Sequence, residues 1–147
     1  MTGVEFELYL YKLINSHEIP SIKKTLAEEI RGQVYYSGKR PDNSNEEDIV
    51  ISFVAGIDGT PSVGVIMVNV FVPDKEGSNG QPLSRDLARI MNLSQLIKEF
   101  RDTVPVGDIW LDRDTTIQDY PVTPLGVVKQ HYINLQIKLY YNGTIND

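Results

Sequence analysis

The sequence predicts an α+β fold, with one mixed and mostly antiparallel sheet, an N-terminal helical region and one long helix packed on the sheet. Three observations predict this class. Apolar residues recur at helical spacing from about residue 84 to residue 101. Two strand-like segments, 48–55 and 63–72, are separated only by a short turn, and 127–141 alternates apolar and polar residues. Such short connections favour antiparallel pairing, because parallel strands need long crossovers.

The N-terminal region is predicted to hold two helices. Thr2 is followed three residues later by Glu5, which is the spacing of a capping box, and apolar residues then recur at helical spacing. This helix should end near residue 15 or 16, before a proline. A second, shorter helix is expected over 21–31, with Ser21 as its N-cap and Gly32 just beyond its end.

The segments between and after the helices are typical of strands and polar connections. Residues 34–36 form a short predicted strand, and a polar loop follows as far as residue 48. The segment 63–72 is apolar on both sides, which predicts a strand covered on both faces. The polar stretch 74–81 should be a loop. A further strand is expected over 108–114, extending at most to residue 118.

Length and composition limit the classes of protein to which the chain can belong. The chain has 147 residues, of which 41% are hydrophobic and 23% charged, so we expect a single globular domain spanning 1–147. The absence of cysteine excludes thiol catalysis, disulfide scaffolds and Cys-ligated metal sites. No apolar run reaches the roughly 18 residues of a membrane helix, and the N-terminus does not look like a signal peptide. A net charge of −6 argues against a general nucleic-acid binder.

The residues that could carry chemistry are few. No nucleophile or metal ligand lies at a sequence spacing from His17 or His131 that is typical of a catalytic or metal site. Both histidines are therefore expected to be structural or surface residues. Asp108, Asp112 and Asp114 would share one face of a strand. They could bind a divalent cation through oxygen, or they could be the solvated side of an edge strand. Weighing these, the sequence predicts no catalytic residue, no metal and no cofactor.

Two further patterns concern surfaces. A basic cluster lies close in sequence to two tyrosines and to the acidic run 46–48, and its members are Lys23, Lys24, Arg31, Lys39 and Arg40. Basic and aromatic residues together can track single-stranded nucleic acid, but the adjacent acidic run favours a solvated face or a subunit contact. The chain also has eight tyrosines. They suit either half-buried interface positions or the aromatic edges of an ordinary sheet.

The stretch 31–72 and the residues just after it carry a set of short motifs. They are Gly32-x-Val34-Tyr35 after a helix, Gly38-Lys39-Arg40-Pro41 with Ser44, Glu47-Asp48-Ile49-Val50-Ile51, and Val68-Asn69-Val70-Phe71-Val72-Pro73-Asp74. In this order they resemble small tail-terminator and tail-completion proteins of long-tailed phages, often found in prophages. The order helix, hairpin, helix, strands is also similar to the lambda-type tail-terminator fold.

This resemblance implies a structural part of the virion tail rather than an enzyme. Such proteins form a ring, typically a hexamer, on the head-proximal end of the tail tube, where they stop tube growth and dock the filled head. The implied partners are further copies of the chain, the tail tube protein and the head–tail connector protein, with assembly in the cytoplasm of the bacterial host. No sequence-specific nucleic acid and no membrane is implied. An acidic lumen would let DNA slide through the ring.

Contacts in a ring of more than two copies join different patches of neighbouring subunits. We expect these patches in the loops 38–47 and 74–81 and in the strand that carries Trp110. The candidate interface residues are Lys39, Arg40, Glu46, Glu47, Trp110, Asp112 and Asp114. Because long polar loops lose much entropy when they are ordered, a partner is expected to order both loops on assembly.

Two other functions stay open at this point. One is a small ligand-binding or enzymatic α+β domain, with its pocket between the long helix and the sheet. Such a pocket needs a convergent set of polar residues, which the sequence does not single out. The other is an adaptor at a different ring of the head–tail connector, which would share the acidic charge and the ring-forming parts.

Overall fold

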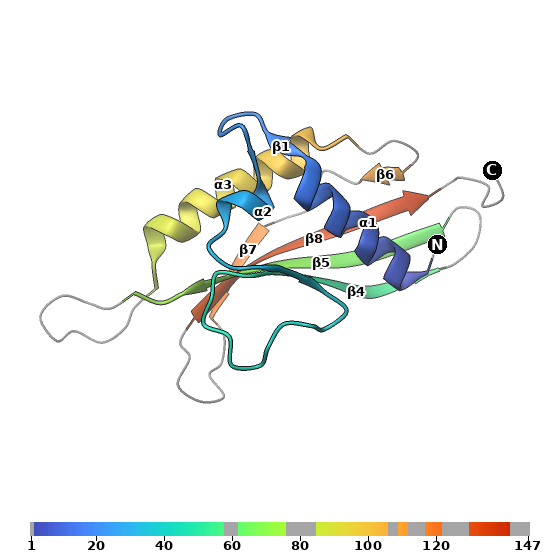
Figure 1. Ribbon diagram of the computed structural model, residues 1–147. Helices are drawn as coiled ribbons and strands as arrows, with labels where there is room; N and C mark the ends of the chain where they lie inside the picture. Colours follow the sequence, from blue (N-terminus) through green and yellow to red (C-terminus); the bar gives the residue numbers. More distant parts are fainter. Residues whose placement is uncertain are drawn as a thin grey trace, which may run out of the picture.

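A computed structural model describes residues 2–57, 62–75, 85–105, 109–111, 117–121 and 130–141. It confirms the predicted α+β class (Figure 1). The elements in chain order are α1 (Gly3–Ser16), β1 (Glu18–Ile19), β2 (Lys24–Thr25), α2 (Leu26–Glu29), β3 (Val34–Tyr36), β4 (Ile49–Ile57), β5 (Ser62–Pro73), α3 (Leu87–Thr103), β6 (Ile109–Leu111), β7 (Ile117–Pro121) and β8 (Gln130–Tyr141).

The main sheet is mixed and mostly antiparallel, as predicted. Its strand order is β3-β4-β5-β8-β6, and β7 also pairs with β8. Every pair is antiparallel except β3 with β4. The hairpin of β4 and β5 is confirmed by a register that runs from Ile49 opposite Val70 to Ile57 opposite Val63. β1 and β2 form a separate two-stranded ribbon.

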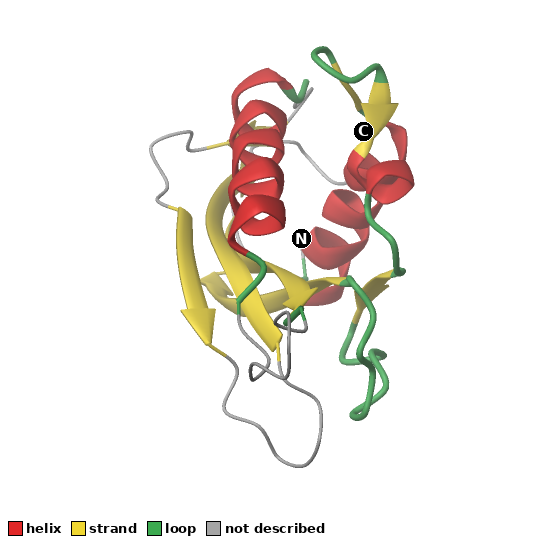
Figure 2. Ribbon diagram, turned by 90° about the vertical axis from the view of Figure 1, so that its left-hand side faces the viewer, coloured by secondary structure: helices red, strands yellow, loops and turns green. Residues whose placement is uncertain are grey.

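The helices lie together on one face of this sheet. In Figures 1 and 2, α1 and α3 lie on the same side of the strands, and α2 contacts both helices. The core fills the space between these helices and the sheet. Its buried side chains include Phe6, Leu10 and Ile14 of α1, Ile49 and Ile51 of β4, Ile66, Val68, Val70 and Val72 of β5, Leu93, Ile97 and Phe100 of α3, and Ile133, Leu135, Ile137 and Leu139 of β8.

The opposite face of the sheet carries no helix among the elements that the structure describes. Along β5, buried and half-buried residues alternate strictly. Both faces of this strand are thus at least partly covered, as predicted, but one face is covered more fully than the other. The buried set faces the helices, and the half-buried set, which includes Val65, Met67 and Phe71, faces away from them. The apolar residues on one face of β5 thus belong to the core, and those on the other face form a half-buried apolar surface.

The N-terminal helix is confirmed, but the second helix is much shorter than predicted. Thr2 and Glu5 form the capping box of α1. Helix α2 has only four residues, and its N-cap is Thr25, whose own capping box with Glu28 outcompetes Ser21. Ser21 lies instead in the turn between β1 and β2, where its hydroxyl and its backbone N–H donate to Glu99 of α3. Lys23, with a φ of 55°, closes that turn.

The other predicted bounds shift modestly. The long helix begins at Leu87, three residues later than predicted, because Asp86 is its N-cap and accepts from the Arg89 N–H. The predicted strand over 108–114 is represented by β6, and the prediction for residues 112–116 lies outside the described part of the chain. The same holds for most of the turn after β4 and for most of the loop 74–81.

A substitution at Gly64 tests the close packing of α1 on the sheet. Gly64 lies on the core face of β5, and an added Cβ would lie 2.8 Å from Cδ2 of Phe6. We expect Gly64→Ala to lower the free energy of unfolding by about 1–3 kcal/mol, because an overpacked core must shift. Urea unfolding measures this change. Gly38→Asn is the control, since that site is open and asparagine tolerates its φ of +69°. Equal stability of Gly64→Ala and the parent chain would contradict the packing.

Candidate functional site

The loop of residues 37–48, hereafter the anchored loop, contains four of the candidate interface residues. It leaves β3 through a tight turn in which Ser37 and Gly38 both have positive φ. The Lys39 N–H donates to the Tyr36 carbonyl across this turn, and the Lys39 ammonium lies over the Tyr36 ring. Ser37 Oγ donates to the buried Glu7 carboxylate of α1. The start of the loop is therefore tied to the first helix.

Asp48 anchors the far end of the loop. Its side chain is only 1% exposed. It accepts hydrogen bonds from the Gln33 N–H at 2.8 Å, from Ser44 Oγ at 2.7 Å and from Arg40 Nε at 2.9 Å. Burial by itself raises the pKa of Asp48, but the hydrogen bonds from Ser44, Gln33 and Arg40 outweigh it and hold that pKa below its ordinary value. Asp48 is thus a charged group held by one cation and two neutral donors.

Arg40 connects this anchor to the sheet. Besides its ion pair with Asp48, it donates to the carbonyls of Ser44 and Glu46 and to Oε1 of Gln130 on β8. Its guanidinium lies 3.9 Å from the centroid of the Phe71 ring. Phe71 belongs to the half-buried face of β5, so Arg40 fixes the anchored loop against the sheet face that the helices do not cover.

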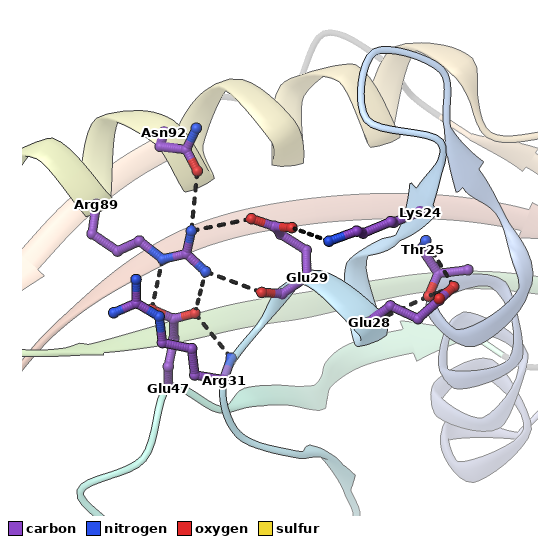
Figure 3. A network of polar contacts seen from close by, with 8 residues as sticks. All are labelled: Lys24, Thr25, Glu28, Glu29, Arg31, Glu47, Arg89 and Asn92. Carbon is purple, nitrogen blue, oxygen red and sulfur yellow. Dashed lines mark hydrogen bonds and ion pairs between the residues drawn. The ribbon is translucent and has the colours of Figure 1, made fainter.

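Glu47 forms a second anchor, with Arg89 of α3 (Figure 3). Arg89 donates to the two carboxylate oxygens of Glu47 at 2.6 and 2.8 Å, and Glu47 also accepts from the Arg31 N–H. Arg89 further donates to the side chain and the carbonyl of Glu29. Hydrogen bonds with Glu47 outweigh desolvation and raise the pKa of Arg89 above its ordinary value. One guanidinium thus joins α3, the end of α2 and the anchored loop.

The predicted interface residues divide into four groups. Lys39 and Glu46 are exposed on the anchored loop, as a contact residue must be. Arg40 and Glu47 point inward and hold the loop, and Glu47 is only 3% exposed. The backbone of Trp110 lies in β6. The predictions for Asp112 and Asp114 fall outside the described residues.

The loop also has anchors within its own chain. Two buried carboxylates and two arginines hold residues 38–47, whereas the expectation that a partner orders this loop on assembly stays a prediction. Sequence reasoning missed Arg89, which is the cation of the second anchor. The only available signal was an arginine in the first turn of a helix, where a cation opposes the helix dipole and so needs another reason to be there.

Two grooves lie on the described surface, away from the contact between α3 and the sheet. One, of about 470 Å³, lies between the β1–β2 turn and α3 and is lined by Ser21, Ile22, Asn92, Gln95, Leu96, Lys98, Glu99 and Asp102. The other, of about 240 Å³, lies beside the anchored loop and is lined by Arg31, Asn45, Glu46, Glu47, Val72, Pro73, Asp74, Lys75 and Asp86. The sheet-facing side of α3 is instead packed in the core.

Both histidines hold elements together. His17 follows α1 as its C-cap, bonds through Nε2 to Thr103 Oγ1 at 2.9 Å and meets the Phe100 ring edge-on. His131 Nδ1 lies 2.8 Å from Asp74 Oδ1, so it ties β8 to the end of β5. Within the described ranges, no three histidine or acidic side chains gather as a metal site would require.

Replacing Asp48 tests the first anchor through its pH dependence. The pKa of Asp48 is lower in the folded chain than the ordinary value of about 3.9. Its stabilisation is therefore complete above about pH 4 and is lost as pH falls through the lower, folded-state pKa. We expect Asp48→Asn to cost about 3 kcal/mol at pH 7, because Arg40 loses its charge partner. Urea unfolding between pH 7 and pH 2 measures both effects.

The exposed acid of the same loop supplies the control. Asp42→Asn should leave both the stability and its acid dependence close to those of the parent chain. If Asp48→Asn retained the parent's loss of stability in acid, Asp48 would not be the titrating anchor.

Replacing Arg89 tests the second anchor. Arg89→Met leaves Glu47 buried without its cation and should lower the free energy of unfolding by roughly 3–5 kcal/mol. Arg89→Lys should restore only part of this loss, because an ammonium cannot reproduce the two-pronged contact. Lys98→Met, at an exposed site of the same helix, is the matched control. A loss no larger than that of Lys98→Met would rule out the network as an anchor.

No family model matches the sequence, and no curated protein matches it. Among the described helices, none is long and apolar enough to span a membrane. The function is therefore inferred from geometry and from the motifs of residues 31–74.

Proposed function

We propose that this chain is a structural, non-enzymatic protein that assembles with copies of itself into a ring, as a tail terminator or tail-completion protein of a phage or prophage. In this role the ring, a hexamer by the resemblance of its motifs, closes the head-proximal end of the tail tube. Its partners are the tail tube protein and the head–tail connector protein. The chain assembles in the bacterial host cytoplasm and ends in the virion tail.

The observation that carries this proposal is the anchored loop. It presents a row of exposed polar residues while its backbone is held by buried ion pairs on both Glu47 and Asp48. The exposed residues of the loop are Ser37, Gly38, Lys39, Pro41, Asp42, Asn43, Asn45 and Glu46. A surface that is rigid before binding loses little conformational entropy when a partner docks. Such a loop suits a protein whose work is to present a fixed shape.

Two pKa shifts among the described residues accompany these anchors. The pKa of Asp48 is lowered and that of Arg89 is raised, and both shifts arise from the contacts that hold the loop. Structural ion-pair networks shift pKa values as active sites do. The side chains of Asp48 and Arg89 are only 1% and 12% exposed. Both groups therefore stay charged at neutral pH, and their ion pairs hold the loop.

The acidic charge is consistent with a ring that DNA crosses. The chain has a net charge of −6, and every copy in a ring adds the same charge. A lumen lined by acidic residues would repel DNA phosphates, so the duplex could slide without binding.

Light scattering on a sizing column tests the self-assembly. Across a wide concentration range, we expect a species of about six times the chain mass of 16.6 kDa. The parent chain should form the same species faster when tail tube protein is present as a template. A strict monomer at every concentration, with and without that template, would contradict the proposal and favour a small ligand-binding domain.

Charge reversal on the loop identifies the surface. Asp42→Lys alters an exposed residue that makes no anchor contact, so the chain should fold and yet assemble at least tenfold more weakly. Glu18→Lys makes the same change on β1, away from the loop, and should assemble normally. Circular dichroism checks the fold of both variants. Equal assembly of the two variants would rule out the anchored loop as a contact surface.

A further inference from the structure

The main sheet has an open edge on β4. β3 pairs only with residues 49–51 of β4, so no described strand covers that side of β4 from Ser52 onward. The Phe53 N–H is already taken, because it donates to Oε1 of Glu7 at 2.9 Å. The open part therefore runs from Val54 to Ile57, and Val54, Ala55 and Gly56 are exposed. It begins at an irregularity in the pairing between Phe53 and Ala55.

The other end of the strand order is β6. This three-residue strand pairs with β8 and with no other described strand. In Figure 1 it lies at the margin of the sheet, beyond β8. Among the described strands, the sheet thus ends in β3 and the open part of β4 on one side, and in β6 and β7, which both pair with β8, on the other.

The two edges lie at the same level along the strands. Gly56 is opposite Gly64, Gly64 is opposite Leu139, and Leu139 is opposite Leu111 of β6. One row of paired residues therefore crosses the sheet from the open part of β4 to β6. The three pairings that separate β4 from β6 are all antiparallel, so these two strands run in opposite directions.

Within the described residues of these two strands, neither edge carries the usual protection against pairing. Natural edge strands are blunted by charged residues, especially lysine, or by proline. The open part of β4 reads Val54-Ala55-Gly56-Ile57, and β6 reads Ile109-Trp110-Leu111. Both are uncharged and lack proline, and Val54 is 52% exposed. Such edges offer unpaired backbone groups to another strand.

From these observations we propose that the β4 edge of one copy, residues 54–57, pairs antiparallel with β6 of the next copy. This rests on the proposed self-assembly and names the surfaces that perform it. The contact joins two different edges, which is the heterologous type that a ring of more than two copies requires. If the symmetry axis of the ring runs roughly along the strands, each strand has the same direction in every copy. Because β4 and β6 run in opposite directions within one copy, β6 of the next copy pairs antiparallel with β4. Because both edges lie at one level, the contact needs no step along the strands and closes a ring instead of a climbing filament.

Cysteine cross-linking tests this pairing directly, because the chain has no native cysteine. Ala55→Cys is combined in turn with Ile109→Cys, Trp110→Cys or Leu111→Cys. Within one chain the two edges are three strand spacings apart, roughly 14 Å, whereas a disulfide needs Cα atoms within about 7 Å. Any disulfide between the two sites therefore joins different chains. Mild oxidation of at least one double variant should give a ladder of covalent oligomers that reduction returns to single chains.

The control variants separate the alternatives. Mixing Ala55→Cys with a β6 single variant should give covalent dimers only, and Ala55→Cys alone should give none. Efficient dimers of Ala55→Cys alone would mean that β4 pairs with itself, which overturns the proposal. Rings seen by light scattering without a ladder from any of the three pairs would overturn the edge pairing and leave the self-assembly standing. Monomers throughout would overturn both.

A charge on the open edge gives a second readout. Val54→Lys places an edge-blocking lysine at an exposed position and should weaken assembly at least tenfold while the monomer stays folded. Met91→Lys is the matched control, since Met91 is 60% exposed on α3, away from either edge. Normal assembly of Val54→Lys would overturn the edge pairing.

Discussion

The structure depends on two adjacent buried carboxylates, Glu47 and Asp48, each of which forms an ion pair with an arginine. Removing a carboxylate from water is costly unless cations and hydrogen-bond donors replace the lost solvent. Arg89 reaches Glu47 from α3, and Arg40 reaches Asp48 from within the loop. These two contacts fix where β4 begins, how α3 lies beside α2, and the path of the chain between β3 and β4. The hydrophobic core could form with many loop conformations, but the ion pairs select one.

Local patterns predicted most of the fold. The capping box of α1, the β4–β5 hairpin and the alternation of β8 each depend on residues close in sequence, so the sequence revealed them. The predicted start of the second helix was wrong because Ser21 and Thr25 can both serve as N-cap residues. Only the tertiary hydrogen bond of Ser21 to Glu99 decides between them. The sequence also did not show that the two faces of β5 are covered to different extents. An apolar residue looks the same in sequence whether it enters a core or a half-exposed face.

The candidate site was only partly accessible to sequence reasoning. Motifs indicated the loop and its charged residues, but not which of them point inward. Arg40 and Glu47 are as charged as Lys39 and Glu46, and only the positions of Arg89 and Phe71 separate the anchors from the exposed residues. The open sheet edges also could not be predicted from the sequence, because an edge depends on which strands lie next to one another in the sheet. A protein that keeps its helices on one face and its loop held rigid is suited to join copies of itself through backbone edges.

The measurement that tests the central claim most directly is amide hydrogen exchange, residue by residue, in the free chain and in the proposed assembly. The Arg31 and Gln33 amides donate to Glu47 and Asp48, so they should already be strongly protected in the free chain. Within residues 54–57, the amides that point away from β5 should gain protection only on assembly. Exchange of Arg31 and Gln33 at the rate of an unfolded chain would contradict a loop that is ordered before any partner arrives.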